Sequence, residues 1–162
     1  MISARHLTLA AAIVALAALA RSPLAQGNRW LVDAPDERTR LERLETYLRG
    51  FDQPMWEVGM RYLHVEQAIA DRNWALATYH WDKVKTTIDN GLMKRPARRA
   101  SAEKIFLGAP WEQLSAALKT SDVAAIGPAF DRAKAACEGC HVAEQVAFMN
   151  DQPMFRRGPA RR

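Results

Sequence analysis

Near its C-terminal end, the 162-residue chain carries the stretch Cys137-Glu138-Gly139-Cys140-His141. It has the C-x-x-C-H form of a site where haem is attached through two thioether bonds. Two thiols add to the two vinyl groups of one porphyrin, and the histidine that follows directs its imidazole at the iron. On a helix, Cys137, Cys140 and His141 are spaced i, i+3 and i+4 and share one face. The motif therefore predicts a helix and one covalently attached haem c.

Three other uses of the two cysteines are weaker. A thioredoxin-like redox pair occurs in a βαβ context, and no segment shows the sustained alternation of a strand. A structural zinc site takes four ligands. Besides the motif, the chain offers only His64 and His80 once the expected leader is removed. A structural disulfide would leave the adjacent histidine as a coincidence, so haem attachment is the preferred interpretation.

Residues 1–25 have the pattern of a secretory signal peptide. Arg5 supplies the positive charge, an apolar run without charge follows it, and cleavage is expected after Ala20 or Ala25. The run is short for a membrane span, and an uncleaved anchor is the less favoured alternative. We therefore expect a soluble periplasmic protein with no stable span after cleavage, and residues 26–162 as the haem-binding domain. Export agrees with the motif, because c-type haem is attached outside the cytoplasm.

Composition is that of a soluble globular chain with a basic surface. Hydrophobic residues make up 49% of the chain, charged residues 25%, and the formal net charge is +5. We interpret the excess of arginine and lysine as solvated surface. Because the chain is expected to be exported, nucleic acid is not an expected partner. The sequence offers no credible nucleophile–base pair and no second metal site, so no enzymatic activity is expected.

Apolar stripes at helical spacing predict a short helix at about 35–49, a second at about 53–71 and three more that follow it. Gly91 is interpreted as the stop of the third helix, and Gly108 with Pro110 as a break in the fourth. The last helix carries the haem motif. The expected N-caps of the helices after the first are Asp52, Asn73, Ser101 and Ser121.

Four amphipathic helices with short connections bury their stripes best as a bundle. The expected fold is all-α: an antiparallel four-helix bundle with an additional short N-terminal helix and a core at about residues 52–148. The tail from about Asn150 is expected to be loosely ordered. The tetrapeptide Asp-Gln-Pro-Met occurs at 52–55 and again at 151–154, too short an echo to indicate a repeat.

The chain resembles the class II c-type cytochromes, which comprise the cytochrome c-prime fold and its low-spin relatives. The resemblance rests on C-x-x-C-H in the last of four predicted bundle helices and on the Phe130-x6-Cys137-x2-Cys140-His141 spacing. It covers about residues 52–145, and the N-terminal helix and the tail depart from it. It implies thioether bonds at Cys137 and Cys140 and His141 as an axial iron ligand. Gly59, Tyr62 and Phe130 are expected haem-pocket walls, and four tryptophans are expected in the core or pocket: Trp56, Trp74, Trp81 and Trp111.

In this family the first bundle helix presents a residue to the distal side of the haem. That residue is a ligating Met in low-spin members and an apolar residue in five-coordinate members, whose iron is open to small gases. The family pattern of Met followed by Gly four residues on matches Met55 and Gly59, so the resemblance implies Met55 as the sixth ligand. Met60 is the second choice and Met154 the third. The remaining alternatives are an open site, His64 and His80.

Electron transfer through Fe(II)/Fe(III) cycling of one haem is the expected function, with exported redox proteins as donor and acceptor. A five-coordinate or Met-displaceable haem protein that binds NO or CO is the first alternative. A cytochrome subunit of a larger redox complex is the second, motivated by the helix at 35–49 and the tail. The resemblance also implies a homodimer through the first two bundle helices, whose surface the helix at 35–49 would block or replace.

Overall fold

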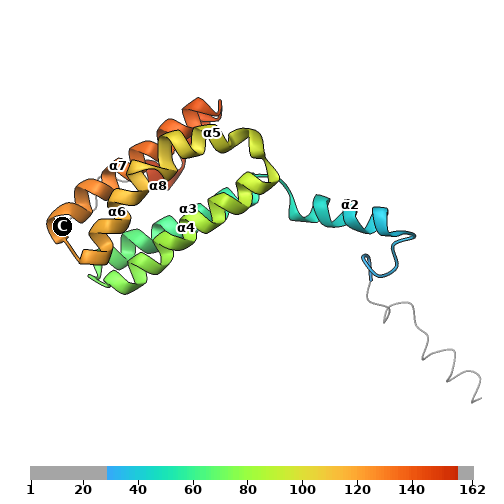
Figure 1. Cartoon of the computed structure of the whole chain (residues 1–162), viewed down its shortest axis with the longest axis horizontal. Coiled ribbons are helices and arrows are strands. Elements are labelled where there is room, and N and C mark those ends of the chain that lie inside the picture. The colour runs from blue at the N-terminus through green and yellow to red at the C-terminus, as the bar shows by residue number, and fades with distance from the viewer. Residues whose placement is uncertain (1–28, 157–162) are drawn as a thin grey trace, which may run out of the picture. The chain divides into compact units, whose positions relative to one another are not determined.

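The computed structural model describes residues 29–156, and the predicted signal peptide with its cleavage sites at Ala20 and Ala25 lies outside them. Every regular element in the described part is a helix or helical turn, which confirms the predicted all-α class (Figure 1). In chain order these elements are α2 (Glu37–Leu48), α3 (Asp52–Ala70), α4 (Trp74–Lys94), η2 (Pro96–Arg98), α5 (Arg99–Ala102), η3 (Glu103–Leu107), α6 (Ala109–Thr120), α7 (Val123–Ala143), η4 (Ala147–Asp151) and α8 (Pro153–Arg156). The chain divides into two compact units, residues 1–48 and 49–162. Within residues 29–156, no helix combines the length and the apolar character needed to cross a bilayer.

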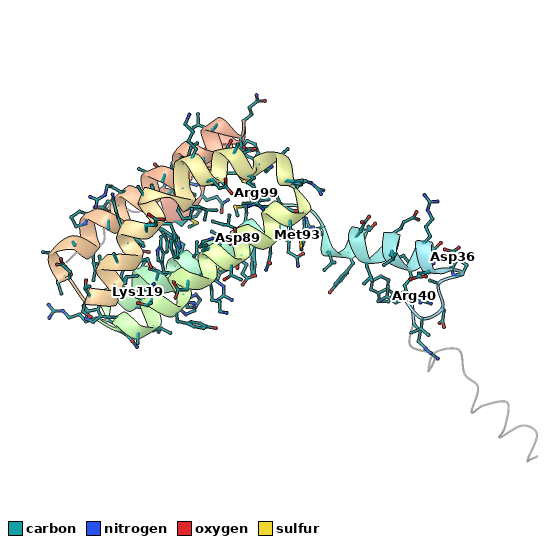
Figure 2. The ribbon with its side chains drawn as sticks, viewed as in Figure 1. Asp36, Arg40, Asp89, Met93, Arg99 and Lys119 are labelled. Atoms are coloured by element: carbon teal, nitrogen blue, oxygen red, sulfur yellow. The ribbon has the colours of Figure 1, made fainter. Side chains whose placement is uncertain are left out.

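In the N-terminal unit, α2 confirms the helix predicted over 35–49. Asp36 Oδ1 accepts a hydrogen bond from the backbone N–H of Thr39 at 2.7 Å, and the hydrogen bonds from Thr39 lower the pKa of Asp36. Arg40 Nε donates to the carbonyl of Leu31 at 3.0 Å. Figure 2 labels Asp36 and Arg40 in this unit. None of the residues of α2 is buried. Local side-chain bonds rather than a packed face therefore support this helix.

Helices α3 and α4 lie side by side and are joined by a tight turn at residues 71–73 (Figure 1). Their buried stripes follow the helical period and consist of Tyr62, Val65 and Ala68 on α3 and Ala77, Trp81, Val84 and Ile88 on α4. Trp56 lies on the face of α3 opposite Val65, and its side chain is 73% exposed. The prediction that Trp56 contributes to the core or pocket is therefore wrong.

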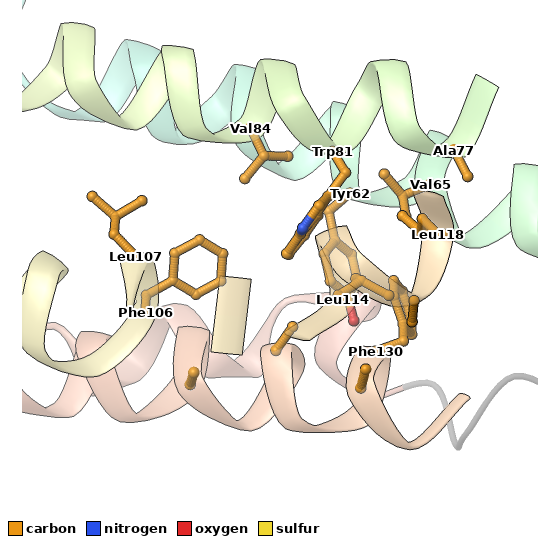
Figure 3. Close-up of a cluster of buried hydrophobic side chains, with 14 of the residues drawn as sticks. Tyr62, Val65, Ala77, Trp81, Val84, Phe106, Leu107, Leu114, Leu118 and Phe130 are labelled. Carbon is orange, nitrogen blue, oxygen red and sulfur yellow. The ribbon is translucent and has the colours of Figure 1, made fainter. Parts of the chain in front are cut away.

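The second half of the chain closes the core. Helices α6 and α7 pack along one another, α4 contacts α6, and η3 contacts α7. The side chains that meet there, seen in Figure 3, are Phe106, Leu107, Leu114, Leu118 and Phe130, together with Tyr62, Val65, Trp81 and Val84. Leu114 and Leu118 are fully buried. Each such leucine stabilises the fold by about 1.5–3 kcal/mol relative to an exposed one.

The starts of α4 and α3 show how far capping could be predicted. Asn73 caps α4 as predicted, since its Oδ1 accepts a hydrogen bond from the backbone N–H of Leu76 at 3.1 Å. Asp52 does not cap α3, because Phe51 occupies the cap position and makes no side-chain bond there. Asp52 is the first helical residue and forms an ion pair with Arg49 at 2.5 Å. The acidic side chain thus stabilises the positive end of the helix from one position further in.

The other two predicted caps are also wrong. Ser101 lies inside α5, because Pro96 begins the helical turn η2 that runs directly into this helix. Ser121 adopts a left-handed conformation with φ of 55° and ends α6. Asp122 caps α7 instead, and its Oδ1 accepts from two backbone N–H groups of the first turn, each at 3.1 Å.

Gly91 and Gly108 affect their helices in different ways. Gly91 does not stop the third predicted helix, because α4 continues through it to Lys94. A Cβ at Gly91 would lie 2.8 Å from the ring of Phe51, so glycine permits the close approach of the start of α3. Gly108 and Pro110 break the fourth helix as predicted, with the π-helical turn η3 before the break and α6 after it.

Helix α7 ends in a Schellman motif that turns the chain back. The N–H of Val146 donates to the carbonyl of His141 at 2.8 Å, and a second bond from the N–H of Gln145 measures 3.1 Å. Gln145 has the left-handed φ of 60° that this motif requires. The chain then returns against α7 as η4 and continues into α8. The prediction of a loosely ordered tail from Asn150 is therefore wrong for the described part of that tail.

Candidate haem-attachment site

Helix α7 carries the three motif side chains, as the motif predicts. Cys137, Cys140 and His141 are each partly exposed, and both thiols are free. Cys137 packs against the hydrophobic core. A Cβ at Gly139 would approach Ile105 of η3 to 3.7 Å, so η3 lies over part of the motif. Cys137 therefore stands at the edge of the core, and neither thiol is engaged in a disulfide.

Burial and neighbouring groups keep both thiols protonated. Burial, followed by Cys140 and Glu138, raises the pKa of Cys137 to about 12. Burial and Glu144 raise the pKa of Cys140, while Arg98 acts in the opposite direction. The attacking cysteine of a thioredoxin-like pair has a lowered pKa, because its thiolate is the nucleophile. This environment therefore disfavours the redox-pair interpretation of the motif.

Tyr62 and Phe130, two of the predicted wall residues, stack beside Cys137. Their ring centroids are 4.6 Å apart and the ring planes are inclined by 21° (Figure 3). Burial raises the pKa of Tyr62, and the neighbouring Cys137 acts in the same direction. Among the described residues, the buried Tyr62 hydroxyl has no hydrogen-bond partner. Such a group costs about 1–3 kcal/mol, so a polar atom of a bound molecule would be stabilised here.

Gly59, the third predicted wall residue, faces the C-terminal segment. A Cβ built at Gly59 would lie 3.5 Å from Sδ of Met154, in α8. Met154 and Met55 are both partly buried against the core. Met55 and Gly59 are four residues apart and therefore share a face of α3. The segment thus brings a second thioether to the face of α3 from which the resemblance draws the sixth ligand.

The C-terminal segment also contacts His141 on two sides. Nδ1 of His141 lies 2.7 Å from Oδ1 of Asn150. The ring of Phe155 meets the imidazole edge to face, with centroids 5.6 Å apart and an interplanar angle of 88°. Asn150 Nδ2 donates to the carbonyl of Glu138 at 3.2 Å. With Nδ1 engaged, Nε2 is the nitrogen left for a metal.

The remaining predicted ligands lie on other parts of α3 and α4. Met60 is 40% exposed. His64 stacks on His80 with ring centroids 4.9 Å apart, and Nδ1 of His64 lies 2.7 Å from the carbonyl of Met60. Nδ1 of His80 is buried and has no partner among the described residues. The structure therefore pairs these two histidines with each other, across the interface of α3 and α4.

Sequence reasoning missed Asn150 and Phe155, because the tail was expected to be loosely ordered. The repeated Asp-Gln-Pro-Met at 52–55 and 151–154 was the signal that could have found them. In the first copy Pro54 stands in the first turn of α3, and in the second Pro153 begins α8. In each copy the methionine that follows is partly buried against the core. The second copy thus marks the start of a short helix.

The side chains of this site fit a covalently attached haem. Two free thiols stand one helical turn apart, a histidine follows them, and the adjoining wall has a buried hydroxyl that lacks a partner. Within residues 29–156, no three His, Cys, Asp or Glu side chains form a group that could hold a metal ion directly. Comparisons with protein-family models, curated proteins and solved structures found no match to this chain.

Proposed function

We propose that the protein is an exported mono-haem cytochrome c of the class II kind that transfers electrons. One observation carries the proposal: Cys137, Cys140 and His141 follow one another at haem-attachment spacing on a single helix, with both thiols free beside a buried aromatic wall. Bound haem would supply one-electron chemistry between Fe(II) and Fe(III). The donor and acceptor would be exported redox proteins that dock transiently in the periplasm.

The finer fold belongs to the same proposal. Helices α3, α4 and α7, together with the broken helix α5–α6, would be the four members of an antiparallel bundle, and α2 would be the additional helix. The short turn between α3 and α4 supports this arrangement, as does the packing of α6 along α7. The haem would lie near the end of the bundle where η3 and the C-terminal segment meet the motif.

Each residue of the site has a role in the proposal. Cys137 and Cys140 would form the thioether bonds, and His141 would ligate the iron. Tyr62 and Phe130 would wall the pocket and exclude water. A dry pocket disfavours the extra positive charge of the ferric state, so these two rings would raise the reduction potential.

The sixth ligand in this proposal is Met55, with Met154 as its competitor. Both thioethers are partly buried against the core. Met154 was only the third choice from the sequence, but the approach of its sulfur to Gly59 makes it a stronger candidate for the sixth ligand. Met60 is less well placed, because it is 40% exposed, whereas Met55 and Met154 are partly buried against the core. Six-coordination by histidine and methionine suits electron transfer, because no ligand must arrive or leave.

The spectrum of the purified full-length protein tests this function. We expect a low-spin ferric spectrum with a sulfur-to-iron charge-transfer band. Met55→Leu should abolish the band, and loss in Met154→Leu instead would transfer the ligand role to Met154. Met93→Leu is the matched control, because Met93 is 73% exposed on α4 (Figure 2). A high-spin spectrum of the unmutated protein would contradict methionine ligation and favour a protein that binds NO or CO at an open iron.

A further inference from the structure

Asn150 joins two parts of the motif through one side chain. Its Oδ1 lies 2.7 Å from Nδ1 of His141, and its Nδ2 donates to the backbone carbonyl of Glu138 at 3.2 Å. Glu138 lies between the two cysteines, so the amide reaches both the thiol-bearing turn and the histidine. Asn150 and His141 are both only partly exposed. The bridge is therefore partly shielded from the water that would compete for its hydrogen bonds.

The two contacts together determine which nitrogen of His141 carries the proton. A backbone carbonyl can only accept, so the NH₂ group of Asn150 must face Glu138. The amide oxygen then faces His141, and an amide oxygen also only accepts. Nδ1 of a neutral His141 must therefore carry the hydrogen. The lone pair is left on Nε2, which is the nitrogen that must ligate a metal when Nδ1 is engaged.

The turn after α7 brings Asn150 to this position. The Schellman bonds at Gln145 and Val146 reverse the chain, and η4 then packs against α7. Phe155 of α8 meets the same imidazole edge to face. The ring of His141 is thus held by a hydrogen bond at Nδ1 and by an aromatic contact from one short segment. Its orientation is fixed by packing as well as by the bond.

We propose that Asn150 is a positioning residue that fixes His141 in the Nδ1–H form and presents Nε2 to the iron. This inference rests on the proposed haem attachment at Cys137 and Cys140. An acceptor at Nδ1–H makes an imidazole a stronger electron donor through Nε2. The strength of the acceptor at position 150 therefore sets how strongly the ferric state is stabilised, and with it the reduction potential.

The first test measures the reduction potential of the haem-loaded protein. Asn150→Ala removes the acceptor, and we expect the potential to rise. Asn150→Asp provides a stronger, charged acceptor, and we expect the potential to fall. Gln152→Ala and Gln152→Glu are the controls, because Gln152 is an exposed amide of the same segment, bonded to Met149 rather than to His141. Both controls should stay close to the unmutated protein. Shifts of the same sign in the two Asn150 variants, or no shift beyond the controls, would overturn the proposal.

The second test reads the tautomer in the full chain produced without haem. Nitrogen-15 NMR at about pH 8.5, where a histidine is ordinarily neutral, should show His141 with a protonated Nδ1 and an unprotonated Nε2. Asn150→Ala should give two averaged nitrogen resonances, whereas Gln152→Ala should keep the native pair. A protonated Nε2 in the unmutated chain would overturn the assignment.

The two tests separate failure of this inference from failure of the proposed function. Should the unmutated protein carry no covalent haem, the proposed function fails and the NMR experiment alone decides the role of Asn150. Should the haem-free chain not be folded, the signs of the potential shifts decide it.

Discussion

Trp81 of α4 and Trp111 of α6 each donate an indole N–H to the backbone carbonyl of the other. The two bonds measure 3.0 Å from Trp81 and 3.3 Å from Trp111. The rings are nearly parallel, with an interplanar angle of 11° and centroids 6.5 Å apart. Phe106 meets the Trp81 ring edge to face. This reciprocal pair ties α4 to α6 and satisfies the polar atom of the largest buried side chain in the core.

Trp81→Phe should destabilise the protein by about 2–3 kcal/mol, because it leaves a cavity and removes one bond of the pair. Trp111→Phe should cost about 1 kcal/mol, since Trp111 is only partly buried and loses mainly the hydrogen bond. Urea denaturation of each variant measures these changes. Trp56→Phe is the control and should stay within about 0.5 kcal/mol, because that side chain is exposed. A Trp81→Phe variant as stable as the control would contradict the role of the pair.

Gly91→Ala should destabilise the fold by about 1–3 kcal/mol, because the new methyl group would meet the ring of Phe51. Gly59→Ala is the matched control within a helix, since its methyl group would meet only Met154 at an ordinary distance. In the haem-free chain Gly59→Ala should be neutral or stabilise by up to about 1 kcal/mol. Denaturation curves of both variants give the comparison. Equal effects at the two glycines would show that helix propensity rather than close packing decides the outcome.

Gln145→Gly should stabilise the haem-free chain by about 1 kcal/mol. Gln145 holds a left-handed φ of 60° in the turn that ends α7, and glycine adopts this conformation without the steric cost of a Cβ. Gln145→Val should destabilise it, since a β-branched side chain is strained there. Thermal unfolding of the three proteins should rank Gly above Gln above Val. The reverse order would mean that this turn is not formed in solution.

Stability should fall as the pH is lowered through the titration range of His80. Burial, followed by the charges of His64 and Arg61, lowers the pKa of His80. The folded state therefore holds the neutral form, while the unfolded chain takes up a proton near its ordinary pKa of about 6.5. This contribution is fully present above about pH 6.5 and is lost as the pH falls toward the lower folded pKa. Urea midpoints measured between about pH 7.5 and 5.5 should decline less steeply in His80→Gln than in the unmutated protein. An unchanged slope in that variant would remove His80 as the cause.

The helices themselves could be predicted because their stripes repeat with the helical period. Tyr62 of the second predicted helix and Trp81 and Val84 of the third lie on these stripes, and all three are buried in the structure. Gly91 shows that a local sequence pattern cannot predict a contact between distant parts of the chain. Glycine is needed at this position because the ring of Phe51 packs against it, and Phe51 is distant in sequence and becomes a neighbour only in the folded chain.

The three motif residues of the candidate site could be predicted from the sequence, but the residues that the C-terminal segment adds to the site could not. Cys137, Cys140 and His141 are fixed by spacing alone, because a helix determines which residues share a face. The contact of Asn150 with His141 depends on a chain reversal at Gln145. Gln145 is left-handed although it is not a glycine, so the sequence contains no signal for this turn. Met154 reaches Gly59 for the same reason, since the turn and the short helix α8 must both form first.

Covalent attachment is tested by whether haem stays bound to the denatured chain. The full-length protein should be produced by a host that attaches c-type haem in its periplasm, then unfolded and stained for haem on a denaturing gel. We expect haem at the position of the polypeptide, less haem in either Cys137→Ser or Cys140→Ser, and none in the double variant. An unmutated chain that migrates without haem under these conditions would contradict the account.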